Sequence, residues 1–265
     1  MREAGEQDKV RLLDYLRKGL QDCLYLYIDV MNYGMVSENM KVWVEEEQGE
    51  IVLVVMKYYD SFQVYSHSGQ CRIERVLELL HQYPVAMISA RRDIIQRMEG
   101  KLKDYKAEYG VVYLMDKYRK IGETKKVQLA VQADAKEIAE LICSDEELGE
   151  PYTVENLTLQ LAERIRTQTG RSYIIRENGE IAAHSATYAE TEGIAVVSGT
   201  IVKAAYRNTN CYMILANYMM QELVKEGKAA YTFSLSEKMK DYLDKVHTRC
   251  GEYGRLVRKA GKDRI

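Results

Sequence analysis

The order of the predicted helices and strands repeats once along the 265-residue chain, and this repeat constrains the fold most strongly. In each half, a helix is followed by a run of neighbouring strands, a helix, a strand, a second helix and a last strand. The polar segment DKYRKIGETKK, residues 116–126, lies between the halves. We therefore predict two domains, residues 1–122 and 123–265, each of the α/β class with a mixed central sheet flanked by helices. A single large α/β domain is the less economical alternative.

In the first half, apolar residues recur at helical spacing from Asp8 onward, and Pro84 is predicted to end a later helix. The run LYLYI at residues 24–28 is typical of a strand. Further strands are predicted at residues 41–44, 51–59, 62–65, 85–88 and 111–115, and two helices around Ile73 and Ile94. The β-branched run at 51–59 indicates a central strand.

The second half carries the strongest local signal of the chain, the pair Asn178-Gly179, which favours the positive φ angles of a tight type I′ hairpin turn. Gly227 is a typical residue to follow a helix end. Strands are predicted at residues 127–131, 172–176, 180–185, 194–202, 229–234 and 253–258, and helices at 133–142, 154–168, 210–226 and 237–246.

Composition excludes several classes of protein. Apolar residues make up 46% and charged residues 29%, which is typical of a soluble globular protein. The net charge of −2 argues against sequence-independent nucleic-acid binding, which needs a basic surface. No apolar run is long enough for a membrane span, and the polar start MREAGEQDK argues against a signal peptide. The five cysteines are scattered without a C-x-x-C pair, so we expect a reduced, cytoplasmic protein without a disulfide framework or metal site.

Residues 194–227 hold the most informative pattern, a long apolar strand, a short polar turn and a helix. A helix N-terminus presents unpaired N–H groups and a partial positive charge, so it suits a pyrophosphate. Arg207 adds a cation there. By itself this pattern also fits an ordinary strand–turn–helix with Asn210 as its N-cap.

This segment resembles the central motif of the GNAT acetyltransferase family, an apolar strand followed by [QR]-x-x-G-x-[GA]. In RNTNCY, Arg207 takes the first position, Asn210 the glycine position and Tyr212 the Gly/Ala position. Asparagine is the non-glycine residue most tolerant of left-handed backbone, so Asn210 is expected to keep the shape of the loop. Downstream, DYLDKVHTRCGEYGRL resembles the family's Tyr-x-x-x-Gly-Phe stretch and places Tyr242 at the tyrosine position. The resemblance covers roughly residues 127–260.

The resemblance implies that the C-terminal half binds acetyl-CoA as acyl donor. Main-chain groups of Thr200, Ile201 and Val202 are then expected to bond the pantetheine and the thioester carbonyl. The pyrophosphate is expected at Arg207 and at the N–H groups of Asn208, Thr209, Asn210, Cys211 and Tyr212.

The implied reaction is direct transfer of an acetyl group to an amine. Tyr242 is the expected acid for the leaving thiolate. Glu192, acting through a water, and His184 are the candidate bases. Packed side chains without a catalytic role remain the alternative for Tyr242 and for His184.

The corresponding junction of the first half, VYSHSGQCRIE at residues 64–74, lacks the Arg-x-x-Gly-x-Gly/Ala motif. It resembles a GNAT domain that has lost its cofactor site and has a structural or acceptor-binding role. We predict an N-acetyltransferase acting on a small-molecule or peptide amine. The alternatives are a non-catalytic CoA-binding sensor or interaction module and, more weakly, a scaffold without ligand. No pattern specifies the acceptor or the oligomeric state.

Overall fold

A computed structural model describes residues 1–35, 37–118 and 126–259 of the chain, which divides into two compact units. The first unit consists of Met1–Val112, Ser234–Glu237 and Cys250–Ile265, and the second of Tyr113–Phe233 and Lys238–Arg249. The predicted domain boundary between residues 122 and 123 lies outside the described residues.

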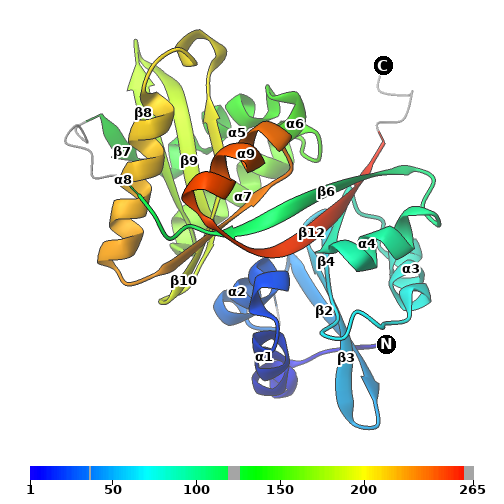
Figure 1. Cartoon of the computed structure of the whole chain (residues 1–265). Coiled ribbons are helices and arrows are strands. Elements are labelled where there is room, and N and C mark those ends of the chain that lie inside the picture. The colour runs from blue at the N-terminus through cyan, green and yellow to red at the C-terminus, as the bar shows by residue number, and fades with distance from the viewer. Residues whose placement is uncertain (36, 119–125, 260–265) are drawn as a thin grey trace. The chain divides into compact units, whose positions relative to one another are not determined.

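The first unit is built on a mixed sheet with the strand order β1-β2-β3-β4-β5-β12-β6 (Figure 1). Its strands are β1 (Arg2–Glu3), β2 (Met40–Glu47), β3 (Glu50–Tyr58), β4 (Ser61–Tyr65), β5 (Met87–Arg91), β6 (Tyr105–Leu114) and β12 (Thr248–Arg258). The meander β2-β3-β4 is antiparallel, β4 and β5 are parallel, and β5 and β12 are antiparallel. Its helices are α1 (Lys9–Arg17), α2 (Leu24–Tyr33), α3 (Ile73–Gln82) and α4 (Arg92–Glu99).

Helices α3 and α4 bury their apolar stripes on one face of this sheet. Val76 of α3 and Ile95 of α4 are fully buried against Phe62 of β4 and Ile88 of β5. As predicted, α3 stops just before Pro84, with Tyr83 as its C-cap.

The prediction of a strand at residues 24–28 is wrong, because these residues form the first half of α2. The consecutive residues Leu26, Tyr27 and Ile28 are all buried, so the run is enclosed on successive sides rather than on alternate ones. A short apolar run is compatible with a buried helix as well as with a strand, and periodicity does not separate the two. The helix continues to Tyr33 and ends at Gly34, whose φ is 72°.

The second unit has the strand order β11-β10-β9-β8-β7, and the end of β6 lies beside β11. The strands are β7 (Val127–Leu129), β8 (Arg171–Glu177), β9 (Glu180–Glu190), β10 (Ile194–Val202) and β11 (Ala229–Ser234). The helices are α5 (Ala135–Cys143), α6 (Glu146–Gly149), α7 (Val154–Thr167), α8 (Cys211–Lys225) and α9 (Glu237–Val246). Strands β7 to β10 are antiparallel neighbours, and β10 and β11 are parallel.

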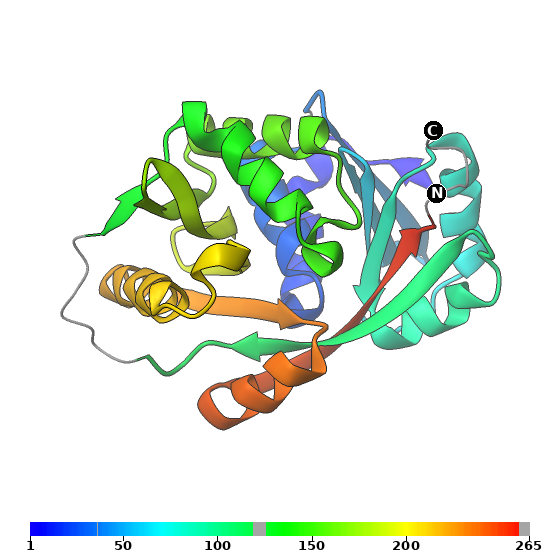
Figure 2. The same ribbon diagram turned by 90° about the horizontal axis from the view of Figure 1, so that it is seen from above.

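Helices cover both faces of this sheet (Figures 1 and 2). Helix α8 packs through Leu215 and Met219 on the face that carries Val197. Helices α5 and α7 pack on the opposite face, which carries Ile174 and Ile201. Each domain core therefore has the mixed sheet flanked by helices that the sequence predicts.

The predicted local signals of this half are confirmed. Asn178 and Gly179 have φ angles of 53° and 84° in the β8–β9 turn. Gly227 has a φ of 73° and follows α8, where the Lys228 N–H bonds the Leu223 carbonyl in a Schellman pattern.

The last strand of the chain has a partner that the sequence does not indicate. β12 begins at Thr248, five residues before the predicted start, and its segment Tyr253–Val257 pairs with β5 of the first unit. β6 likewise begins at Tyr105 rather than at Val111.

Candidate functional site

Strands β10 and β11 separate part-way along their length. Their parallel pairing runs from Ile194 beside Ala229 to Val197 beside Thr232. β10 then continues through Ser198–Val202, five further residues without a partner in β11, of which Ser198, Ile201 and Val202 pair with β9. Ligands of open α/β sheets bind at the carboxyl ends of parallel strands, and this separation leaves an edge of β10 open there.

A β-bulge lies in the part of β10 that has left β11. The register with β9 shifts between Ser198 and Ile201, and Gly199 within this interval has a φ of 63°. Before the bulge, Val197 faces α8, whereas after it Ile201 faces α5 and α7. The bulge therefore exchanges the two faces of the strand, because one extra residue interrupts the alternation.

The same register gives the direction of the main-chain groups beyond the bulge. The Lys203 N–H bonds the Ala182 carbonyl of β9 at 2.9 Å, so by alternation Ile201 also faces β9. Val202, and Thr200 before it, then direct their N–H and C=O groups to the open edge. Of the three main-chain groups predicted to bond the cofactor, Ile201 is thus turned away.

The predicted phosphate loop lies between β10 and α8. Asn208, Thr209 and Asn210 are exposed, and Asn210 has a φ of −86°, so the left-handed conformation expected for it is not adopted. The Thr209 hydroxyl accepts the N–H of Cys211 at 3.4 Å. The N–H groups of Tyr212 and Met213 have no acceptor inside the helix because they belong to its first turn, whereas the Ile214 N–H bonds the Asn210 carbonyl at 3.0 Å.

Two further predicted residues flank this loop. The Arg207 guanidinium is 59% exposed, donates to the Val202 carbonyl at 3.3 Å, and forms an ion pair with Asp145 at 3.4 Å. A cation with this exposure remains available to a phosphate. Cys211 is buried among the apolar side chains under α8, which makes it a core residue.

Tyr212 and Tyr242 lie near one another at the start of α8 and on α9. Burial raises the pKa of Tyr212 to about 12, and the nearby Tyr242 hydroxyl adds to that rise. Tyr242 is 41% exposed. Tyr212 is half-buried, in contrast to the exposed Asn208 and Asn210 beside it.

His184 lies in the interior of the unit, with none of its surface exposed. Its Nδ1 is 2.8 Å from the Gly199 carbonyl and its Nε2 is 3.2 Å from the Ser172 hydroxyl. Burial lowers the pKa of His184 to about 4, and the bond to Gly199 offsets only part of this effect. A substrate amine has no access to this imidazole, whose two nitrogens are both engaged.

Glu192 lies at the other end of β10. It is exposed in the turn that precedes Ile194, whereas the open edge ends at Val202. A strand of this length spans about 26 Å at about 3.3 Å per residue. The structure therefore does not bring Glu192 to Tyr242 and Arg207. Sequence reasoning also missed Gly199 and Ser172, although a glycine inside a strand pattern is a signal for a bulge.

The chain is similar to solved structures in fold, at low sequence identity. No protein-family model matches the sequence, and no curated protein matches it. A solved structure of a Drosophila protein has a TM-score of 0.68 at 12% identity, covering 98% of this chain and 99% of its own. A GCN5-related N-acetyltransferase-like protein from Streptococcus suis has a TM-score of 0.65 at 12% identity, covering 96% of this chain and 99% of its own.

A tandem GNAT protein from the clavulanic acid biosynthesis pathway has a TM-score of 0.58 at 14% identity, with 98% of both chains covered. This chain has the tandem GNAT fold. At these identities the likeness concerns the fold, and the chemistry has to be argued from the residues themselves.

The first unit of the tandem GNAT fold differs from the second at the equivalent strands. β4 pairs with β5 from Ser61 to Val64 and ends one residue later, at Tyr65. It therefore lacks the five-residue open edge of β10, and its sequence also lacks the Arg-x-x-Gly-x-Gly/Ala motif.

The loop after β4 is also held in a form that disfavours a phosphate. Arg97 donates to the carbonyls of Gly69 and Cys71, both at 2.6 Å, and Arg91 donates to the His67 carbonyl at 3.2 Å. Carbonyl oxygens converge on guanidinium groups in this loop, whereas a phosphate requires converging N–H groups.

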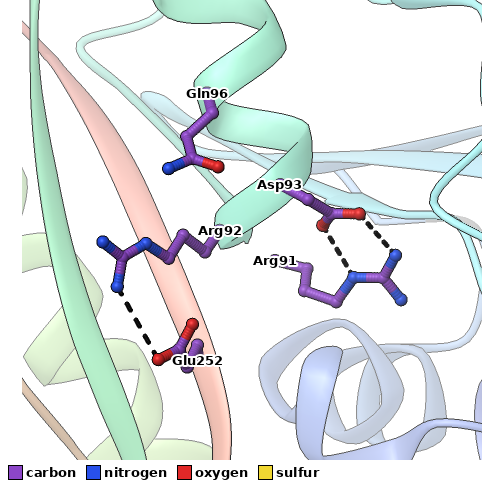
Figure 3. A pocket seen from close by; sticks show the side chains of 5 residues that line it. All are labelled: Arg91, Arg92, Asp93, Gln96 and Glu252. Atoms are coloured by element: carbon purple, nitrogen blue, oxygen red, sulfur yellow. Dashed lines mark hydrogen bonds and ion pairs between the residues drawn. The ribbon is translucent and has the colours of Figure 1, made fainter.

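A pocket of about 320 Å³ lies beside this loop, at the start of α4 (Figure 3). The Arg91 guanidinium donates two hydrogen bonds to the Asp93 carboxylate, at 2.6 and 2.7 Å. The Arg92 guanidinium lies 3.6 Å from the Glu252 carboxylate. Figure 3 shows the two pairs on separate sides of the pocket, with Gln96 above them. The lining holds two cations and two carboxylates, so the pocket has no net positive charge for CoA phosphates.

Residues 1–35, 37–118 and 126–259 meet the requirements of neither a metal site nor a membrane-spanning helix. Within them, no group of three or more His, Cys, Asp or Glu side chains is arranged to hold a metal ion. In the same residues, no helix is long and apolar enough to cross a membrane.

Proposed function

We propose that this protein is an acetyl-CoA-dependent N-acetyltransferase whose cofactor site lies in the second unit. The observation that carries the proposal is the open edge of β10, which runs five residues beyond its pairing with β11 and leads into the N-terminus of α8. Extended N–H groups followed by a helix N-terminus suit the amide-containing pantetheine arm and the pyrophosphate of CoA.

Each part of the cofactor has a partner in this arrangement. The outward N–H groups of Thr200 and Val202 bond the pantetheine and the thioester oxygen. The N–H groups of Tyr212 and Met213 in the first turn of α8 bond the pyrophosphate, and Arg207 supplies a cation. Asn208 and Thr209 border the same site as exposed loop residues.

The reaction is direct acyl transfer. The lone pair of the neutral amine attacks the thioester carbon, and the oxyanion forms beside the outward N–H groups of β10. The carbon–sulfur bond then breaks, the ammonium proton passes to water, and the thiolate takes a proton from Tyr242, whose phenolate regains one from water. The acceptor is a small-molecule or peptide amine. Five cysteines with free thiols are consistent with a reducing, cytoplasmic location.

Calorimetric titration with acetyl-CoA tests the proposal, with Val202→Pro as the informative variant. Proline removes the outward N–H without removing a bond to β9, and Val202→Ala is the matched control that keeps the N–H. Loss of one hydrogen bond is expected to raise Kd about tenfold in Val202→Pro only. Absence of binding by the wild-type protein at millimolar acetyl-CoA would reject the proposal.

A second candidate is a CoA-binding protein without catalysis. It is favoured by the positions of the two predicted bases, since His184 is enclosed and Glu192 lies at the far end of β10. Release of free thiol from acetyl-CoA across a panel of amines decides between the two candidates. In an enzyme, Tyr242→Phe lowers the rate of release by about 10²-fold or more.

A further inference from the structure

His184 contacts the bulge of β10 directly, and its protonation state follows from its partners. A carbonyl oxygen only accepts hydrogen bonds, so the Nδ1 facing Gly199 carries the proton and donates. The unprotonated Nε2 then accepts the hydroxyl proton of Ser172. The imidazole is thus fixed from both sides as a single neutral tautomer inside the unit.

Gly199 lies inside the bulge, where it is in register with no residue of β9, and its buried carbonyl accepts the N–H of His184. Its φ of 63° is a conformation that side-chain-bearing residues rarely adopt. A Cβ placed there would lie 2.3 Å from the Tyr188 hydroxyl oxygen, so the bulge is closely packed as well. A buried carbonyl without a donor is costly, and the His184 N–H removes that cost.

The bulge decides which main-chain groups reach the open edge. With the extra residue at Gly199, Val202 is directed outward and Ile201 toward β9. The Thr200 hydroxyl also turns to the α8 side, where it lies 2.7 Å from that of Ser185. Without the bulge, these directions would be exchanged along the rest of the strand.

We infer that His184 is a positioning residue, whose bond to Gly199 holds the β10 bulge and so directs the Thr200 and Val202 N–H groups toward the acyl-CoA. The inference rests on the proposed function for the identity of the ligand. It replaces the role of base that the sequence suggested for this histidine. His184 touches neither cofactor nor acceptor, and it acts through the shape of the strand.

Three variants separate this role from ordinary core packing. His184→Asn keeps a donor at nearly the position of Nδ1, whereas His184→Leu fills a similar volume without a donor. Ser172→Ala removes the other partner of the imidazole and leaves the Gly199 bond in place. Acetyl-CoA affinity, urea unfolding and the amide NMR resonances of Gly199, Thr200 and Val202 are measured for each.

We expect His184→Asn and Ser172→Ala to keep Kd within about threefold of the wild type. His184→Leu is expected to raise Kd about tenfold or more, while it still unfolds cooperatively and shifts the three amide resonances. Unchanged resonances and affinity in His184→Leu would overturn the inference, as would an equal loss of affinity in all three variants. If the wild type binds no acetyl-CoA, the proposed function fails, and the resonances alone still decide whether His184 holds the bulge.

Discussion

Acidification should destabilise the second unit through His184, and the size of the effect follows from its burial. In the unfolded chain this imidazole titrates near its ordinary pKa of 6.5, whereas burial lowers the pKa to about 4 in the folded protein. Between these two values the unfolded chain binds more protons than the folded one. The free energy of unfolding therefore falls as the pH falls through this interval.

The expected loss is about 1.4 kcal/mol per pH unit, or about 3 kcal/mol between pH 6.5 and 4. The side chain has no exposed surface, so solvent screening does not reduce this figure. Such a loss is a substantial fraction of the stability of an ordinary domain.

Urea unfolding of the wild type and of His184→Asn, at several pH values from about 7.5 to 4.5, measures the effect. Asparagine keeps a donor for Gly199 but does not titrate, so the wild type should lose about 2–3 kcal/mol more than the variant over this range. Burial also lowers the pKa of His247, with Asp116 opposing the shift, and this contribution cancels in the difference. Parallel stability curves for the two proteins would refute the reasoning.

Three other substitutions test the backbone and loop arguments by urea unfolding. Gly179→Ala should cost about 1 kcal/mol, because the residue has positive φ but open space around it. Gly199→Ala should cost about 2–4 kcal/mol, since Tyr188 must also move; equal costs for the two glycines would contradict the packing argument. Arg97→Met should cost about 2 kcal/mol by removing the donors to Gly69 and Cys71, and a neutral effect would show that these carbonyls find other partners.

The two units share a similar order of helices and strands, but only the second has a candidate cofactor site. β10 extends five residues past its parallel partner, whereas β4 extends one. The loop after β4 is also held by Arg91 of β5 and Arg97 of α4, which donate to its carbonyls. We therefore expect acetyl-CoA to bind the second unit alone, with one site per chain in the titration.

Much of the candidate site was predictable because its elements are determined locally. The bounds of β10, β11 and α9 agree with the prediction, since each is a periodic segment between clear turn signals. Arg207 and the loop after β10 were found through the resemblance of RNTNCY to a known motif. The distance of Glu192 was also implicit in the sequence, because an extended strand separates its two ends.

The sequence by itself determined the class of fold, the repeat of its elements and the Asn178-Gly179 turn, because periodicity and turn chemistry act between near neighbours. Only the tertiary structure decided that residues 24–28 are helical, that β12 pairs with β5, and that His184 holds Gly199. These outcomes depend on which distant strand or side chain offers burial or a hydrogen-bond partner. Such partners are set by the packed sheet, so His184 acquires its role only when β9 and β10 lie side by side.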